Sequence, residues 1–279
     1  MKVLPFKIPK PQQNALVFQD DLDVIFYDKL HQHEEIQLSL IVSGEGSLIV
    51  GDTINHYETG DILIIGSNLP HVFISDEHTT KPSHMMTLFF TKHAFGPHFF
   101  DLVELEALEP FFKRAEQGFK VTSKKKQVTD LFYALKTSSK LECFIILIRL
   151  LQTTATTAFE SLSSYSYDKR YTDNEGKRMR DVFEYTMTHF NQDITLETIS
   201  EVAVMTKNAF CKYFKKRTNK TYFQFLNELR IEHACKLIVK DNDLSISEIA
   251  YRSGFKNISN FNRQFKSVKG GIPSAYKRR

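Results

Sequence analysis

Two short segments of this chain, about fifty residues apart, carry basic side chains at matching positions, and the second also carries amide side chains. One is the run Phe210–Lys215 and the other is the run Phe261–Lys266. In each run two phenylalanines stand four residues apart, which places both rings on one face of a helix and turns the polar residues toward other faces. Arginine and lysine suit guanine O6 and N7, and asparagine suits adenine N6 and N7. The two runs therefore predict a pair of helices that contact nucleic acid.

Each run follows a shorter amphipathic segment and a tight turn, so each copy predicts a helix-turn-helix whose second helix enters the DNA major groove. In the second copy Arg263 is the expected base-reading residue, and Lys266 is the expected phosphate contact. The candidate DNA contacts are Lys207, Asn208, Cys211, Lys212 and Lys215 in the first copy and Asn257, Ser259, Asn260, Arg263, Gln264 and Lys266 in the second.

The charge distribution favours this interpretation over an ordinary solvated helical face. Residues 177–279 hold 20 Lys and Arg against 10 Asp and Glu, a net charge of +10, whereas residues 1–176 carry a net charge of −6. The net charge of +4 for the whole chain hides this asymmetry. A basic segment of this kind is typical of a protein with a polyanionic partner.

The elements that must position these residues divide the chain into four parts. Residues 1–96 contain short apolar runs separated by Gly, Asn and Pro turns, which predict the strands of a sandwich or small barrel. A helical period follows over 97–160, and residues 161–176 lack an apolar period and read as a linker. Residues 177–279 are helical by pattern, with expected caps and stops at Thr206, Asn219, Thr221 with Gln224, Ser245 with Glu248, Asn257 and Gly270.

Composition argues against several other classes of protein. The longest apolar run, Cys143–Leu151, is interrupted by Arg149 and is too short to span a bilayer. No glycine-rich phosphate loop, nucleophile elbow or paired-carboxylate motif stands out, so the sequence does not predict an enzyme of those types. An odd number of widely spaced cysteines indicates a reduced, cytoplasmic protein rather than a disulfide scaffold; these are Cys143, Cys211 and Cys235.

The segment from Met179 to Arg279 resembles the AraC/XylS family of bacterial transcription regulators. The motifs that carry the resemblance are Phe214–Lys216, Asn227–Ile231 with Ala234 and Leu237, Ile246–Ala250, Ser253–Phe255, Ser259–Lys266, Gly270, Pro273 and Tyr276. The resemblance implies two helix-turn-helix subdomains joined by a long helix, with recognition helices in adjacent segments of the major groove. Lys212 stands where the family usually has arginine, which keeps the charge but loses the bidentate fork.

The N-terminal part resembles the sensor domain of the same family, which is cupin-like. The residues that carry this resemblance are His31–Leu38, Gly44–Gly46, Gly60–Ile62 and Leu69–His71. It implies an α+β multidomain chain in which 1–96 form a cupin-like barrel that binds an effector. Helices between the two domains often mediate dimerisation in the family, and 97–160 is expected to do so here. The apolar residues that support a dimer interface in this segment include Phe99, Phe100, Leu147 and Leu151.

Three histidines in the expected barrel leave two interpretations open. Alternate residues on a strand point to one face, so His31 and His33 would both face the interior. In metal-binding cupins such a pair and a later histidine, here His71, converge on a cation, and three imidazoles suit Zn, Fe, Ni or Cu. Gln37 stands where the fourth ligand is usually Glu, which favours the other interpretation, an effector site without metal. Its expected members are His31, His33, Glu35, Gln37 and His71.

Together these features predict a cytoplasmic, sequence-specific transcription regulator that is not an enzyme and needs no cofactor. Its expected partners are double-stranded DNA, a small-molecule effector, a second copy of the chain in a homodimer, and RNA polymerase, with no membrane involved. The alternative is a metal-dependent cupin enzyme with an appended DNA-binding module.

Overall fold

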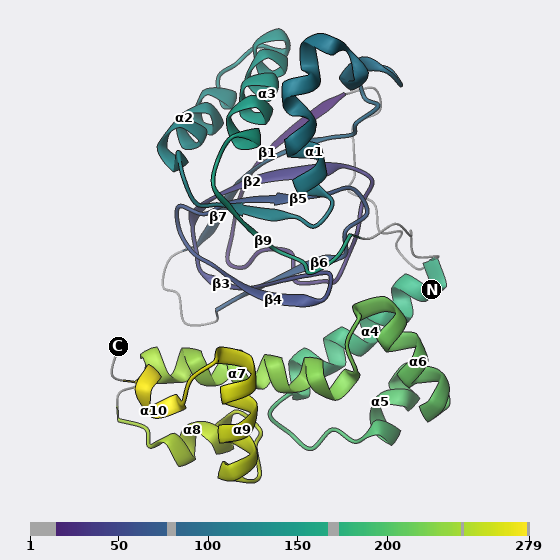
Figure 1. Ribbon diagram of the computed structural model, residues 1–279, viewed down its shortest axis with the longest axis vertical. Coiled ribbons are helices and arrows are strands. Elements are labelled where there is room, and N and C mark those ends of the chain that lie inside the picture. Colours follow the sequence, from purple (N-terminus) through teal and green to yellow (C-terminus); the bar gives the residue numbers. More distant parts are fainter. Residues whose placement is uncertain (1–14, 77–81, 167–172, 241–242, 278–279) are drawn as a thin grey trace. The chain divides into compact units, whose positions relative to one another are not determined.

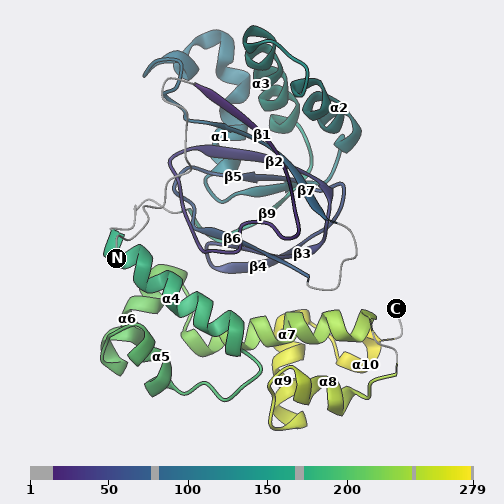
Figure 2. The same ribbon diagram turned by 180° about the vertical axis from the view of Figure 1, so that it is seen from behind.

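The computed structural model describes residues 15–76, 82–166, 173–240 and 243–277. The chain divides into two compact units, Met1–Gly176 and Lys177–Arg279, shown in Figure 1 and from behind in Figure 2. The first unit combines a two-sheet barrel with helices, and the second is helical. The expected α+β multidomain class is therefore confirmed.

Two sheets make up the barrel of the first unit. Its strands are β1 (Leu16–Asp23), β2 (Ile36–Ser43), β3 (Gly46–Val50), β4 (Thr53–Tyr57), β5 (Ile62–Ile65), β6 (His71–Ser75), β7 (Ser83–Phe90), β8 (Phe119–Val121) and β9 (Phe159–Ser161). The large sheet has the order β1-β7-β2-β5-β8-β9, and the small sheet has the order β4-β3-β6. All of these neighbours pair antiparallel, and an isolated bridge between His31 and His71 joins the segment before β2 to β6.

The large sheet is buried on both faces because its strands alternate between two cores. Leu38 and Leu40 of β2 pack on the helical side. Ile41, on the opposite face, packs toward the small sheet together with Leu48 and Tyr57. Since successive side chains point to opposite faces, Gln37 and Ser39 lie on the same inner face of β2 as Ile41. Polar side chains are thus placed inside the barrel by the strand period itself.

Helices cover the outer face of the large sheet (Figure 1). They are η1 (Phe99–Asp101), η2 (Val103–Leu108), α1 (Glu109–Ala115), α2 (Lys125–Leu135) and α3 (Lys140–Ala155). Phe100, Leu147 and Leu151 are buried in one core with Leu38 and Leu88 of the sheet. The segment 97–160, which was expected as a separate helical region, is therefore part of the first unit. It also contributes β8 and the first two residues of β9 to the large sheet.

The expected linker, 161–176, begins too early. Leu162 is buried in the inner core, and its carbonyl accepts hydrogen bonds from Thr53 Oγ1 and, at 3.0 Å, from Asn55 Nδ2. Asp52 Oδ1 accepts from Ser163 Oγ and from the Ser164 backbone N–H, both at 3.0 Å. The chain is thus fastened to the β3–β4 turn through Ser164. Of the rest, 167–172 lie outside the described residues, and 173–176 are helical.

The second unit is a set of helices arranged around one long member. These are α4 (Asp173–His189), α5 (Leu196–Val202), α6 (Lys207–Thr218), α7 (Tyr222–Lys240), α8 (Ile246–Arg252), α9 (Ile258–Lys269) and α10 (Pro273–Tyr276). All of the expected caps and stops are confirmed, including the left-handed Asn219 and Gly270. No helix within the described ranges is long and apolar enough to cross a membrane.

Asp61, the residue directly before β5, is a fully buried carboxylate in the first unit. Its oxygens lie 2.5 Å from Lys120 Nζ and 2.9 Å from Lys125 Nζ, and the Glu58 N–H donates to it at 3.0 Å. Burial alone would raise the pKa of Asp61, but the two lysines outweigh burial and lower it. The carboxylate therefore ties β5 to β8 and α2.

We expect Asp61→Asn to lower the free energy of unfolding by about 3 kcal/mol, because it leaves two lysines facing a neutral amide. A carboxyl with a lowered folded pKa stabilises above its ordinary pKa of 3.8 and loses that contribution as the pH falls through the folded value. Urea unfolding at pH 7 and at pH 3 should therefore show a smaller difference between variant and wild type at pH 3. Asp101→Asn, at an exposed ion pair, is the control and should change stability by less than about 0.5 kcal/mol.

Candidate nucleic-acid interface and histidine cluster

The first helix-turn-helix consists of α5, a short turn and α6. Thr206 begins α6 by accepting a hydrogen bond from the Ala209 N–H at 3.4 Å. Phe210 and Phe214 are fully buried, with ring centroids 5.6 and 5.4 Å from that of Tyr222. Because these rings are buried, the opposite face of α6 points toward solvent. The exposed residues there are the expected contacts Lys207, Asn208, Cys211, Lys212 and Lys215.

The second helix-turn-helix consists of α8, a turn and α9. Asn257 caps α9, since its Oδ1 accepts from the backbone N–H groups of Ser259 at 2.8 Å and Asn260 at 3.2 Å. The side-chain oxygen of Asn257 is therefore used to cap the helix, and only its side-chain NH2 group is left to contact DNA. Phe261 and Phe265 are fully buried. Of the expected contacts, Asn257, Ser259, Arg263 and Lys266 are exposed, whereas Asn260 and Gln264 are half-buried.

One side-chain bond organises the exposed face of α9. Arg263 Nη2 donates to Asn260 Oδ1 at 2.9 Å, one turn toward the helix N-terminus. Residues near the start of a recognition helix are the ones that reach base edges. The bond holds the guanidinium over this part of α9. The first copy has lysines and a cysteine on the matching face, with Lys207 paired to Glu197 at 3.1 Å. Arginine and amide side chains, which suit base edges, are therefore more numerous among the expected contacts of the second copy.

Three histidines converge inside the first unit. The ring centroids of His31 and His71 lie 4.1 Å apart, those of His33 and His71 5.1 Å, and those of His31 and His33 5.8 Å. One nitrogen of each ring lies within 4.8 Å of the others. His33 and His71 are buried and His31 is half-buried. The bridge between His31 and His71 brings together two segments forty residues apart in the sequence.

The backbone places a carbonyl oxygen beside Nδ1 of each histidine. A carbonyl oxygen can only accept, so the ring nitrogen beside it carries a proton. Burial, followed by the neighbouring His31 and His33, holds the pKa of His71 well below its ordinary value, so this ring is neutral. His71 Nε2 is buried and has no hydrogen-bond partner among the described residues. The Nδ1 contacts are His31 with the Lys29 carbonyl at 2.8 Å, His33 with Glu35 at 2.9 Å and His71 with Leu69 at 2.9 Å.

A row of buried polar groups continues from the histidines into the barrel. Gln37 Oε1 lies 3.2 Å from His33 Nε2, and Gln37 Nε2 donates to Ser39 Oγ at 2.9 Å. Ser39 Oγ is 3.1 Å from Thr87 Oγ1 on the paired strand β7. Ser39 and Thr87 were absent from the sequence-based set. Ser39 could have been found from its position two residues after Gln37, whereas Thr87 depends on the strand register.

The cluster has the donor set of a metal site. Three imidazoles, each with a carbonyl at Nδ1, and the Gln37 amide oxygen suit a borderline divalent cation such as Zn²⁺ or Ni²⁺. The orphaned Nε2 of His71 is the observation that favours this fit. The same groups can also hydrogen-bond a polar organic molecule. Glu35 lies at the edge of the cluster, with a carboxylate oxygen 3.5 Å from His33 Nδ1.

Comparison with known proteins gives two domain matches. A helix-turn-helix domain family matches residues 199–279, and a cupin domain family matches residues 27–89. The uncharacterized HTH-type transcriptional regulator YdeC of Bacillus subtilis is 23% identical over 265 residues, which cover 90% of this chain and 87% of that protein.

Two further similarities each cover about a third of the chain. An uncharacterized HTH-type transcriptional regulator of Staphylococcus aureus (strain COL) is 32% identical over 100 residues, which cover 36% of this chain and 13% of that protein. The C-terminal domain of AraT, a response regulator from Geobacillus stearothermophilus, is 29% identical. That match covers 36% of this chain and 84% of the solved chain, with a TM-score of 0.35.

We expect Arg263→Ala to weaken binding to a cognate duplex by about 1–3 kcal/mol and to relax the preference for it, because a base-reading fork is lost. Lys266→Ala should instead weaken binding to all sequences alike and reduce the salt slope by about one unit. Fluorescence anisotropy over a salt series measures both, with a duplex that the wild-type chain enriches from a random pool and a scrambled duplex of the same length. An unchanged ratio of the two affinities in Arg263→Ala would contradict the base-reading role.

Proposed function

From the premise that the chain is an AraC-type DNA-binding transcription regulator with a cupin domain, we propose that a ligand in the barrel controls it. The proposed site comprises His31, His33, Glu35, Gln37 and His71. The observation that carries the proposal is their convergence: burying so many polar groups costs stability, and one buried atom, His71 Nε2, has no hydrogen-bond partner among the described residues. The protein would act in the cytoplasm, with RNA polymerase as a further partner, rather than as an enzyme.

The proposed mechanism links this site to the chain segment that leaves the sensor. His71 begins β6, which pairs with β3 at Val50. The next residue, Gly51, donates its N–H to the Pro70 carbonyl at 2.8 Å, and Asp52 holds Ser163 and Ser164. A ligand that prefers one position of His71 would therefore bias the β3–β4 turn and the segment beyond it. Control of this kind requires different ligand affinities in two states of the protein.

A divalent transition metal is a second candidate for the ligand. His31, His33 and His71 would hold it, with the Gln37 oxygen beside them, and the metal would supply a positive charge inside the barrel. The carbonyl contacts at each Nδ1 and the orphaned Nε2 of His71 support this candidate over the metal-free site expected from the sequence. A metal-dependent cupin enzyme with a DNA-binding module remains the alternative function.

Elemental analysis of the purified full-length chain separates these candidates. An organic effector predicts metal well below one ion per chain, whereas the second candidate predicts one tightly held ion that is lost in a His33→Ala, His71→Ala double variant. In both cases the double variant should retain DNA affinity within about twofold, because the recognition helices lie in another unit, and should lose its response to inducing conditions in cells. His84→Ala, on β7 and paired with Asp20 at 2.6 Å, is the control. A double variant that keeps its response would refute ligand control through this site.

We further propose that α2 and α3 make the protein a homodimer, although not through the residues first expected. Phe100, Leu147 and Leu151 are buried in the first unit's own core, and Phe99 packs against it. The apolar side chains that remain exposed on these helices are Tyr133 (47% exposed), Leu141 (69%) and Ile145 (43%).

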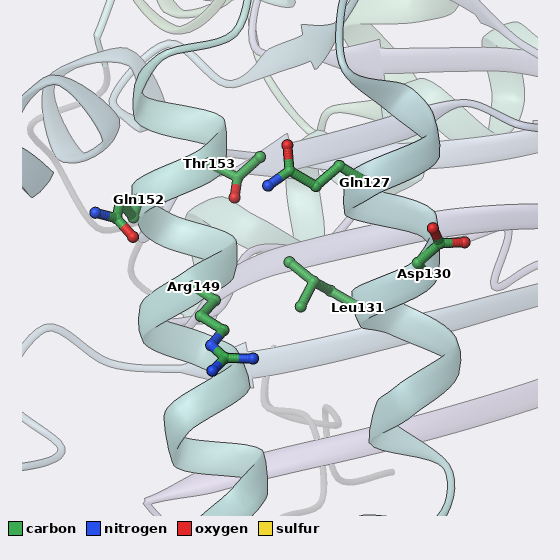
Figure 3. A pocket seen from close by; sticks show the side chains of 6 residues that line it. All are labelled: Gln127, Asp130, Leu131, Arg149, Gln152 and Thr153. Carbon is green, nitrogen blue, oxygen red and sulfur yellow. The ribbon is translucent and has the colours of Figure 1, made fainter.

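A hollow between these two helices supports a symmetric interface. Figure 3 shows side chains from α2 and α3 lining it, and its volume is about 490 Å³. Asp130 comes from α2 and Arg149 from α3. In a two-fold pair the same patch is used on both chains, so the Asp130 of one chain can face the Arg149 of its partner. The lining residues are Gln127, Asp130, Leu131, Arg149, Gln152 and Thr153.

Sedimentation of the full-length chain at micromolar concentration tests the dimer. We expect the wild type to sediment as a dimer and Leu141→Glu as a monomer, because a charge would be buried in the apolar interface. Val103→Glu, at an exposed position on η2, should remain dimeric. A monomeric wild type would mean that these helices serve only to cover the sheet.

A further inference from the structure

The two helix-turn-helix copies are connected by a second link besides α7. Arg230, in the middle of α7, donates from Nε to the Phe190 carbonyl at 2.7 Å and from Nη2 to the Gln192 carbonyl at 2.7 Å. Both carbonyls belong to the loop between α4 and α5, in the first copy. The guanidinium also lies 5.8 Å from the ring centroid of Phe255, in the turn of the second copy. One side chain thus contacts both copies.

The turn of the second copy approaches the same loop closely. Gly254 has φ +86°, and a Cβ there would lie 2.8 Å from the Phe190 carbonyl oxygen and 2.8 Å from Asn191 Cα. The matching turn of the first copy has Val204 at φ 52°, and that side chain is 84% exposed. The backbone bonds of the two turns correspond, because Val204 N–H donates to Glu201 and Gly254 N–H to Tyr251. Only the second turn is packed against a neighbour, and only there would a side chain collide.

Three flanking contacts complete this junction, defined here as the loop 190–193, Arg230, His233 and the turn 253–256. Lys256 Nζ pairs with Asp193 at 2.6 Å. The ring centroids of Phe190 and His233 lie 4.9 Å apart, and His233 Nδ1 is 3.2 Å from Ser253 Oγ. Lys256 is an extra residue relative to the first copy, since α8 follows α5 by fifty positions while α9 follows α6 by fifty-one.

The junction matters because each copy has its own core. Phe183, Phe214 and Phe225 cluster in the first copy. Ile231 and Phe261 belong to a different core in the second. Two bodies joined by one helix can twist about it, whereas a second link removes that freedom. Of the junction contacts, those of Arg230 are charge-assisted, bind two carbonyls of one loop and are partly shielded from water.

We propose that Arg230 is a positioning residue that fixes the distance and angle between α6 and α9, and thereby the spacing of the two DNA segments that the chain accepts. The proposal rests on the DNA-binding function and adds a determinant of specificity that contacts no base. Recognition elements held rigidly tolerate little change in spacing, because each inserted base pair adds about 3.4 Å and about 34° of rotation.

The test uses a duplex that the full-length wild-type chain enriches from a random pool, together with versions carrying one or two extra base pairs between its two contacted segments. We expect insertion to weaken wild-type binding by more than about tenfold. In Arg230→Met this penalty should shrink to about twofold. In Arg230→Lys, which keeps the charge but can reach only one carbonyl, the penalty should be intermediate. Arg252→Met removes an equal charge from an exposed position on α8 and should keep the wild-type penalty.

Duplexes that contain only one of the two segments provide the readout that separates positioning from folding. Retained affinity for each single segment, together with a reduced insertion penalty, supports the proposal. An unchanged penalty in both Arg230 variants overturns it, as does an equal loss of affinity for single segments, which would give Arg230 a role in the stability of one copy. A wild type indifferent to the insertions would show that the junction is not rigid. Failure to enrich any duplex would instead count against DNA recognition itself.

Discussion

Burial of the large sheet on both of its faces is the constraint on which the first unit depends. One face is covered by α1, α2 and α3, and the other by the small sheet. A strand in this position cannot solvate its polar side chains, so they must be satisfied inside. Gln37, Ser39 and Thr87 therefore form a continuous row that ends at His33. The packing that stabilises the sheet also builds the candidate ligand site.

The second unit uses the same helix packing in both of its copies. In each copy two phenylalanines one helical turn apart bury the inner face of the second helix, and this leaves the basic and amide side chains outward. Local caps fix where these helices begin. What the repeat does not supply is the relation between the copies, which the structure establishes through α7 and the contacts of Arg230. The outward residues of each second helix are thus set within that helix, whereas the distance and angle between the two helices depend on the whole unit.

The differences between expectation and structure have a common physical origin. Residues 97–160 have a helical period, but the period alone does not reveal which body the apolar face covers, and the face of Leu147 and Leu151 covers the large sheet. The strands β8 and β9 are three residues each, too short for an alternating pattern to appear. Leu162 is a single apolar residue in a polar stretch, and it is held in place because side chains of β4 donate to its carbonyl.

The sequence by itself determined the two kinds of domain, the helix caps and the outward faces of α6 and α9, because these follow from periods and spacings within one element. It also singled out His31, His33 and His71 as a set. Only the tertiary structure decided that their rings converge and that Arg230 joins the two copies. Those features arise where segments distant in the chain meet, and a contact of that kind leaves no local period to read.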